Sequence, residues 1–176
     1  DPKRQELVPV DKVLELLKLN KDDIVADLGC GNGYLTLPIA KAVETKVQAV
    51  DVQQEMLEYL KYRANEENVD NIVYVKSSLE YLSFNKGTLD KIVSAFVLHE
   101  VPDLIKVLQD LHDMLKEDGI WLILDWEKVE SEMGPGLDHR ISSGDLDRQL
   151  KSSGFHTTVG HLHPSVYYIV VRKNNR

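Results

Sequence analysis

Apolar residues follow two different spacings along this chain, and the two alternate. Short continuous runs rich in β-branched residues, typical of strands buried on both faces, occur at residues 24–28, 47–52, 72–75, 91–96 and 120–124. Before and between these runs, apolar residues recur every three or four positions, which predicts amphipathic helices at residues 10–19, 36–43, 55–64 and 102–119. Strand-like and helix-like segments in this order are typical of a parallel sheet with crossover helices.

The C-terminal part of the chain breaks this order. Residues 126–140 contain a Gly-Pro-Gly sequence and are predicted to form a loop. A short helix follows at residues 145–151, and the last two strands, at residues 157–162 and 166–171, are separated only by residues 163–165. So short a link requires a hairpin, and the sheet must therefore end with an antiparallel strand.

Turn and cap residues mark several helix ends. Thr36 is predicted to cap the helix that it begins, and Gly119 to end the long helix before it. Ser142 and Asp145 fit a capping box at the start of the last helix. The whole pattern predicts an α/β fold with a Rossmann-like seven-stranded sheet, mostly parallel with an antiparallel last strand, and with helices on both faces. We expect a single domain over residues 1–176, without a sizeable cap domain.

The most informative segment is a glycine-rich loop between the first predicted strand and the next helix, Asp27-Leu28-Gly29-Cys30-Gly31-Asn32-Gly33. Glycines allow a sharp turn here and let a ligand lie directly against the backbone. Asp51 ends the second predicted strand about 20 residues later, where an acceptor for ribose hydroxyls is expected. A loop with this context on both sides indicates a ribose-containing ligand rather than a tight turn without a ligand.

The spacing of the glycines distinguishes between such ligands. A dinucleotide-binding loop reads G-x-G-x-x-G and brings a pyrophosphate to a helix N-terminus. Here the spacing is G-x-G-x-G, and Tyr34 stands where the dinucleotide pattern has its third glycine. Asp27, two residues before the first glycine, would repel a pyrophosphate but suits a ligand with an ammonium group. A nicotinamide oxidoreductase is kept as an alternative, although the glycine spacing argues against it.

Two segments, VADLGCGNGY at residues 25–34 and VLHEV at residues 97–101, resemble the class I S-adenosylmethionine-dependent methyltransferases. The nearest resemblance is to the small-molecule branch that includes the ubiquinone and menaquinone C-methyltransferases, and it covers residues 14–171. The resemblance implies S-adenosylmethionine as the cofactor, and a fold whose last strand is antiparallel.

The resemblance also implies cofactor-binding residues at the positions that match the motifs of the family. These are Asp27, Gly29 and Gly31 along the methionine part, with Cys30 between the glycines, Asp51 on the ribose hydroxyls, Val52 on the adenine, Ser78 and Leu79 at the adenine edge, and Ala95 and Phe96 beside the methionine end. Ser78 departs from the pattern, because an Asp is common at that position in this branch. Cys30 is interpreted as a tightly held loop residue rather than as a nucleophile.

Methyl transfer places the acceptor atom opposite the leaving sulfur, and an acceptor that carries a proton can need a base. His99 is the candidate base, because it follows the fourth predicted strand at the edge where open α/β sheets bind ligands. Its alternative is a structural histidine that bonds a loop carbonyl. Tyr34, Trp126 and Arg140 are candidates for contacts to the acceptor, Arg140 by pairing with an anion. Their alternatives are two packing aromatic residues and an arginine on the surface of a loop.

A metal ion is not predicted. His161 and His163 alternate on a predicted strand and could face the same way, but no third ligand is evident nearby. The metal-dependent catechol-type branch would have an acid after the fourth strand, where this chain has Ser94, Ala95 and Phe96.

Composition narrows the class of protein further. The 176 residues carry a formal net charge of -8, which argues against nucleic acid as the main partner, and no apolar run approaches the ~20 residues that span a bilayer. The only cysteine cannot form an internal disulfide, which favours the reducing cytoplasm. We therefore expect a cytoplasmic methyltransferase, monomeric or homodimeric, that acts on a small molecule without nucleic acid or membrane. The alternatives are a non-catalytic cofactor-binding module of the same fold and a methyltransferase that acts on a protein side chain.

Overall fold

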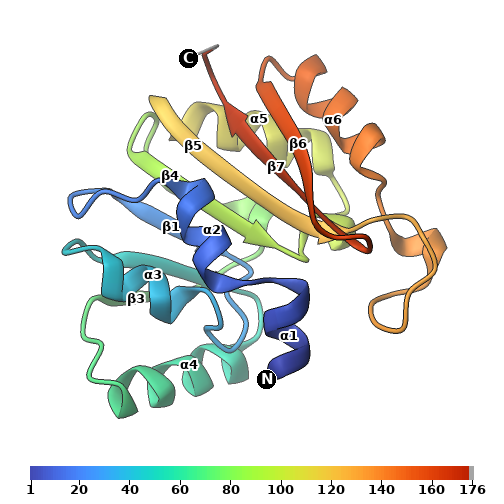
Figure 1. The fold of residues 1–176 in the computed structure, drawn as a ribbon. Coiled ribbons are helices and arrows are strands. Elements are labelled where there is room, and N and C mark those ends of the chain that lie inside the picture. Colours follow the sequence, from blue (N-terminus) through green and yellow to red (C-terminus); the bar gives the residue numbers. More distant parts are fainter. Residues whose placement is uncertain (175–176) are drawn as a thin grey trace.

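A seven-stranded sheet forms the centre of the molecule, with strand order β3-β2-β1-β4-β5-β7-β6 (Figure 1). The computed structural model describes residues 1–174. The strands are β1 (Val25–Leu28), β2 (Val47–Asp51), β3 (Ile72–Lys76), β4 (Leu89–Ala95), β5 (Leu115–Trp126), β6 (His156–His163) and β7 (Val166–Arg172). The first five pair in parallel, and β7 is antiparallel to both of its neighbours, β5 and β6. The predicted fold class is therefore confirmed, including the antiparallel last strand.

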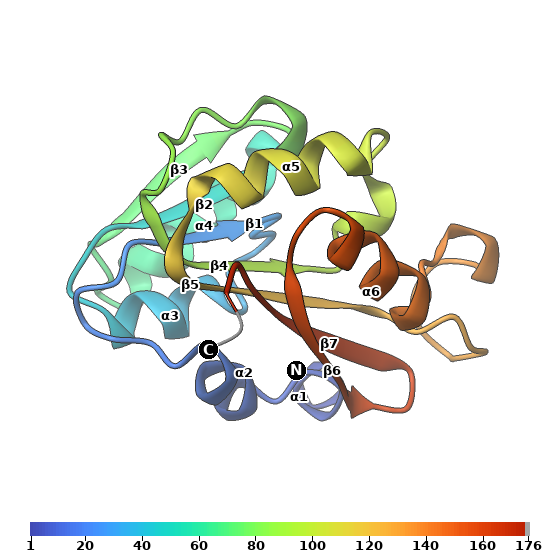
Figure 2. The same ribbon diagram turned by 90° about the horizontal axis from the view of Figure 1, so that it is seen from above.

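Helices cover both faces of this sheet, as Figure 2 shows. The helices α2 (Val10–Leu17), α3 (Thr36–Ala42) and α4 (Gln54–Glu66) pack on one face, and α5 (Leu104–Met114) and α6 (Ser143–Ser152) pack on the other. Alternate residues of each central strand enter the two cores, so Val93 packs with α2 and α3 while Ile92 packs with α5 and α6. Within the described part of the chain, no helix is long and apolar enough to cross a membrane.

The strand order reverses between β1 and β4, since β2 and β3 lie to one side of β1 and β4 and β5 to the other. Chain segments that leave the carboxyl ends of β1 and β4 therefore diverge to opposite faces and open a crevice between them. Open α/β sheets bind ligands at this place. The glycine-rich loop follows β1 there, at residues 29–33, as the sequence predicts.

The boundary between α5 and β5 differs from the prediction. The helix ends at Met114, and Gly119 is not its stop but part of β5. Leu115 pairs with Leu89 of β4, and after a register shift Ile120 pairs with Lys91. Leu115 continues the helical spacing of the preceding leucines, so the sequence pattern hides the change. Strand pairing prevails because it bonds the backbone while keeping the Leu115 side chain fully buried.

Two further details concern helix starts. Thr36 is not a helix cap: Leu35 holds that position, and the Thr36 hydroxyl instead donates a hydrogen bond of 2.6 Å to the Asp27 carboxylate. The cap on α6 is confirmed, since Ser142 accepts a hydrogen bond from the Asp145 N–H at 3.1 Å. A short helix, α1 (Pro2–Leu7), precedes the elements that the sequence predicts. This helix has no buried residue, so its sequence lacks the apolar periodicity from which a helix is predicted.

Candidate active site

The glycine-rich loop is held by the neighbouring strand. The N–H groups of Gly29 and Cys30 both donate to the carbonyl of Val50, at 2.8 and 2.9 Å. Gly33 has φ +91°, and a Cβ atom there would overlap the Leu60 side chain of α4. Gly31, in contrast, has no atom within 4 Å of the place where a Cβ would lie. The loop is thus packed tightly against α4 on one side and leaves its backbone open at Gly31.

Asp51 sits at the end of β2 with both carboxylate oxygens fixed. One oxygen accepts from the N–H of Gly31 at 2.9 Å, and the other accepts from the N–H of Gln53 at 2.9 Å. Each carboxylate oxygen can accept more than one hydrogen bond, so the bonds to the backbone orient the group without exhausting it. A carboxylate held in this way can accept from two neighbouring hydroxyl groups of one ligand.

A cavity of about 130 Å³ opens beside Asp51, and we call it the strand-end cavity because its residues follow β1, β2, β3 and β4. It is lined by Gly29, Asp51, Val52, Gln53, Ser77, Leu79, Ala95, Phe96, Val97 and Glu100. Six of these residues are among the predicted cofactor contacts, namely Gly29, Asp51, Val52, Leu79, Ala95 and Phe96. The acidic wall and the apolar wall of the cavity both suit a nucleoside, whose ribose is polar and whose base is flat and apolar on its faces.

The sequence missed the other four lining residues, which are Gln53, Ser77, Val97 and Glu100. Each of them is adjacent to a predicted residue or lies in the VLHEV segment, and only the local backbone path decides which neighbour faces the cavity. Ser77 lines it in place of the predicted Ser78, because the Ser77 N–H bonds the Asp51 carbonyl at 3.1 Å and continues the edge of the sheet. The strand periodicity that could have indicated this ends at Lys76.

Asp27 is buried beneath the loop rather than in the wall of the cavity, with 2% of its surface exposed. Burial raises the pKa of Asp27 to about 6, and the hydrogen bond from Thr36 opposes this rise. The negative charge of Asp51 raises the pKa further, whereas the positive charge of Arg4 lowers it. A buried carboxylate with one hydroxyl partner favours a cationic ligand group nearby, as predicted for an ammonium.

Cys30 turns its side chain away from the strand-end cavity. The thiol packs with Leu37, Leu57 and Leu60 in the core between α3 and α4. Burial raises the pKa of the thiol, so the group stays protonated and unreactive. Only the backbone of Cys30 faces the loop, which agrees with its interpretation as a loop residue.

His99 lies in the segment after β4 and is bonded to a carboxylate, not to a loop carbonyl. Its Nδ1 is 2.8 Å from Oδ1 of Asp125, and its backbone N–H donates to Oδ2 of the same residue at 3.3 Å. Asp125 is 1% exposed and also accepts from the Trp126 N–H at 2.8 Å. The hydrogen bond to Asp125 raises the pKa of His99 above its ordinary value, against the opposing effect of burial. The other ring nitrogen, Nε2, is 3.6 Å from the carboxylate of Glu100, which lines the strand-end cavity.

Arg140 is buried, so its interpretation as a surface residue is wrong. Its guanidinium donates four hydrogen bonds of 2.8 to 3.1 Å to backbone carbonyls, those of Glu127, Val129, Met133 and Pro135. These bonds use four of the five N–H groups of the side chain and hold the loop of residues 127–136 in place. An acceptor contact by Arg140 would have to use the remaining N–H group.

Tyr34 packs against the N-terminal segment. Its hydroxyl is 2.8 Å from the Gln5 side-chain oxygen and 2.7 Å from the Val8 carbonyl, and the Arg4 guanidinium lies 4.4 Å from the ring centroid. Tyr34 does not line the strand-end cavity, and these contacts favour the packing interpretation over a contact to the acceptor.

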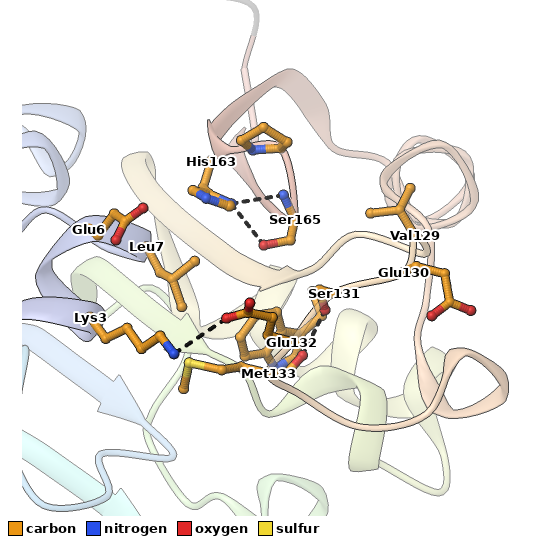
Figure 3. A pocket seen from close by; sticks show the side chains of 12 residues that line it. Lys3, Glu6, Leu7, Val129, Glu130, Ser131, Glu132, Met133, His163 and Ser165 are labelled. Carbon is orange, nitrogen blue, oxygen red and sulfur yellow. Dashed lines mark hydrogen bonds and ion pairs between the residues drawn. The ribbon is translucent and has the colours of Figure 1, made fainter.

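A second cavity, of about 310 Å³, lies where α1, the loop of residues 127–136 and the turn between β6 and β7 meet (Figure 3). We call it the loop cavity. Its lining comprises Lys3, Glu6, Leu7, Trp126, Val129, Glu130, Ser131, Glu132, Met133, His163, Pro164 and Ser165. The ring of Trp126 packs on the ring of Phe96 with centroids 4.9 Å apart, and Phe96 lines the strand-end cavity. One aromatic pair therefore separates the two cavities.

His161 and His163, the two histidines at the C-terminal end of β6, have different partners. Nε2 of His161 is 2.8 Å from the Glu127 carboxylate, whereas Nδ1 of His163 is 2.8 Å from the Ser165 hydroxyl. Residues 1–174 contain no group of three or more His, Cys, Asp or Glu side chains placed to hold a metal ion together.

Comparisons with known proteins agree with this geometry. The model of the family described as methyltransferase domain matches residues 25–119. The mitochondrial arginine-hydroxylase NDUFAF5 of Homo sapiens is 29% identical over 150 residues, which cover 76% of this chain and 42% of that protein. The ubiquinone/menaquinone biosynthesis C-methyltransferase UbiE of Marinomonas sp. (strain MWYL1) is 34% identical over 112 residues, which cover 62% of this chain and 45% of that protein. The chain thus spans less than half the length of these two relatives.

Among solved structures, the crystal structure of a SAM dependent methyltransferase from Aquifex aeolicus superposes with a TM-score of 0.89 and 29% sequence identity. That similarity covers 97% of this chain and 93% of the other chain, so it includes the C-terminal hairpin as well as the glycine-rich loop.

Proposed function

This chain belongs to the methyltransferase domain family, and from this premise we propose that it transfers the methyl group of S-adenosylmethionine to a small-molecule acceptor. The observation that carries the proposal is the Asp51 carboxylate, fixed by two backbone N–H groups at the wall of the strand-end cavity. A carboxylate would repel a pyrophosphate, whereas it can accept hydrogen bonds from a pair of ribose hydroxyls.

The residues of the strand-end cavity fit the cofactor. In this proposal Asp51 accepts from both ribose hydroxyls, and the adenine packs on Val52 and Leu79, which line the same cavity. The open backbone at Gly31 and the buried carboxylate of Asp27 suit the methionine part with its ammonium group. When bound, S-adenosylmethionine supplies a methyl group already activated by the positive sulfur. The protein therefore has to bind, orient and exclude water rather than to provide a nucleophile.

His99 is the proposed base for an acceptor that carries a proton. With its Nδ1–H donated to Asp125, the ring is held in one orientation and leaves Nε2 as the atom that accepts the proton. Asp125 is the positioning residue of this pair, since it also bonds the His99 backbone and is itself buried. The cation formed on His99 would be stabilised by Asp125 and Glu100, which face it from β5 and from the same segment.

The proposal is tested by calorimetric titration followed by a turnover assay. We expect S-adenosylmethionine and S-adenosylhomocysteine to bind in the micromolar range and NAD not to bind, and we expect S-adenosylhomocysteine to form when an acceptor panel is added. Binding of NAD alone, or of none of the three, would refute the cofactor assignment. Cofactor binding without turnover over the whole panel would favour the alternative of a non-catalytic cofactor-binding module.

The acceptor panel should contain small molecules and peptides, because the alternative of a protein side chain stays open. One relative is named as an arginine-hydroxylase and another as a C-methyltransferase, and neither name decides what this chain modifies. A cytoplasmic location, a monomeric or homodimeric state and independence of nucleic acid and membrane stay predictions.

A further inference from the structure

The loop cavity contains one histidine whose tautomer is determined by its neighbours. The backbone N–H of Ser165 donates to Nδ1 of His163 at 3.1 Å, and the Ser165 hydroxyl is 2.8 Å from the same nitrogen. A backbone N–H can only donate, so Nδ1 must be the unprotonated nitrogen of the ring. The neutral imidazole then carries its proton on Nε2.

The Nε2–H group of His163 is directed away from Ser165, and within residues 1–174 it has no hydrogen-bond partner. His163 lines the loop cavity together with Leu7 and Glu6, which Figure 3 labels. The turn that carries it is anchored, because the Ser165 carbonyl accepts from the Glu127 N–H at 2.9 Å and Ser165 is 5% exposed. The cavity therefore has a hydrogen-bond donor of known type at a rigid position.

The other residues that line the loop cavity indicate which kind of ligand could accept a hydrogen bond from His163. Leu7, Trp126, Met133 and Pro164 present apolar surface to the loop cavity. Two charged side chains that line it, Lys3 and Glu132, pair with each other at 3.3 Å and offset each other's charge. The exposed Glu6 and Glu130 carboxylates disfavour a negatively charged occupant.

We propose that His163 determines the specificity for the methyl acceptor, by donating its Nε2–H to a neutral oxygen of an apolar molecule in the loop cavity. The proposal rests on the proposed function, and it adds the site and the chemical class of the acceptor. The cavity volume of about 310 Å³ is at the lower end of ligand pockets, so a small ring-bearing molecule fits it. The packed rings of Phe96 and Trp126 form the wall between this cavity and the one beside Asp51.

The test uses p-cresol and toluene as probes, since they differ by one hydroxyl oxygen, and benzylamine as a cationic counterpart. Binding is followed by the two tryptophan indole N–H signals in an NMR titration. Trp126 lines the loop cavity, whereas Trp121 is fully buried with its indole N–H bonded to Ser94, so its signal is an internal control for folding. We expect p-cresol to shift only the Trp126 signal and to bind about fivefold more tightly than toluene.

His163→Phe keeps an aromatic ring and removes the donor. We expect this variant to bind p-cresol about fivefold more weakly, with toluene affinity unchanged, and His163→Gln to recover part of the loss through its amide N–H. The matched control is His156→Phe, an exposed histidine at the far end of the same strand. Equal affinity of p-cresol and toluene, stronger binding of benzylamine, or an unchanged preference in His163→Phe would overturn the proposal.

These titrations need no cofactor, so their outcome is separate from that of the proposed function. Once an acceptor is known, His163→Phe should raise its KM while leaving the Kd of S-adenosylmethionine unchanged. An unchanged KM would overturn the role of His163 even in an active methyltransferase. Failure to bind S-adenosylmethionine would instead refute the methyltransferase function and leave the probe titrations interpretable.

Discussion

Three aspartates near the carboxyl ends of β1, β2 and β5 differ in their predicted roles because they differ in hydrogen-bond partners. Asp51 is oriented by two backbone N–H groups and keeps capacity for a ligand, Asp27 is buried with one hydroxyl partner, and Asp125 is buried against His99. The residue type is the same in all three places, so the surrounding hydrogen bonds decide which one can hold a hydroxyl, an ammonium or an imidazole.

Replacement of Asp51 should weaken cofactor binding directly. We expect Asp51→Ala to lower the affinity for S-adenosylmethionine and S-adenosylhomocysteine by at least ~1.5 kcal/mol, because hydrogen bonds to a charged group are lost. Calorimetric titration measures this change. Asp22→Ala, at an exposed aspartate away from the cavity, serves as the control. Unchanged affinity in Asp51→Ala would remove the ribose assignment.

Cofactor affinity should depend on pH through Asp27. Its pKa of about 6 means that the carboxylate is charged above that pH and takes up a proton below it. Since an ammonium pairs only with the charged form, we expect the Kd of S-adenosylmethionine to rise as the pH falls from 7 toward 5, about a unit on either side of this pKa. Calorimetry over this range gives the profile.

Two controls make the assignment to Asp27 specific. Adenosine lacks the ammonium group, so its affinity should stay nearly constant over the same range, and Asp27→Asn should flatten the profile of S-adenosylmethionine. A pH dependence that persists in Asp27→Asn would show that another group is responsible.

The pair of His99 and Asp125 predicts a shift in the pH profile of turnover. A base acts in its neutral form, so the rate should rise with pH through the pKa of His99, which Asp125 raises. In Asp125→Asn this pKa falls, and the acidic limb of the kcat profile should move to lower pH, with Glu100 and Arg140 as the remaining charged neighbours.

His99→Ala should slow turnover and leave cofactor affinity unchanged. Equal rates in His99→Ala would exclude it as the base.

Among the elements, the turn from β1 into α3 is the most constrained. It must pass from a buried strand to a helix while leaving backbone free for a ligand, and its glycines meet this demand in different ways. Gly33 is required by the packing of α4, whereas Gly31 faces open space. Thr36 lies where this turn enters α3, and its hydroxyl donates a hydrogen bond to Asp27 rather than capping the helix.

Gly33→Ala should therefore be strongly destabilising. The substitution adds a Cβ that would overlap Leu60 and places a non-glycine residue at φ +91°. We expect a loss of about 2–4 kcal/mol of unfolding free energy, measured by urea denaturation. Gly87→Ala is the matched control, since Gly87 also has a positive φ, +62°, but nothing within 4 Å of the added atom. A similar small loss in both variants would contradict the packing argument.

At the scale of the whole molecule, the buried Arg140 connects the end of the sheet to the loop of residues 127–136, which lines the loop cavity. Arg140 bonds four carbonyls of the loop, and its guanidinium lies 5.5 Å from the ring of Trp126. Trp126 in turn packs on Phe96, so the loop, the end of β5 and the segment after β4 form one connected wall.

Loss of this arginine should loosen the loop of residues 127–136, whose carbonyls it bonds. We expect Arg140→Met to reduce stability by about 2 kcal/mol or more, and to increase hydrogen exchange of the amides of residues 127–136. Arg148→Met, at an exposed arginine of α6, is the control. Unchanged exchange in this loop would mean that other contacts hold it.

Much of the fold and part of the site follow from short-range signals. The alternation of strand and helix spacing predicts the sheet, and the glycine-rich loop with Asp51 predicts the ligand edge, because parallel strands bring their carboxyl ends together. The errors lie where local signals compete. Leu115 fits a helical spacing but pairs as a strand, and Thr36 fits a helix cap but bonds the Asp27 carboxylate.

The sequence by itself determined the fold class, the position of the loop and the acid that follows it, since these depend on periodicity and on residues close in the chain. Only the tertiary structure decided that Asp125 bonds His99, 26 residues away, that Arg140 is buried against its own loop, and that His163 faces a cavity. These contacts join segments that no pattern links, because they arise where loop conformation and sheet order bring separate strand ends together.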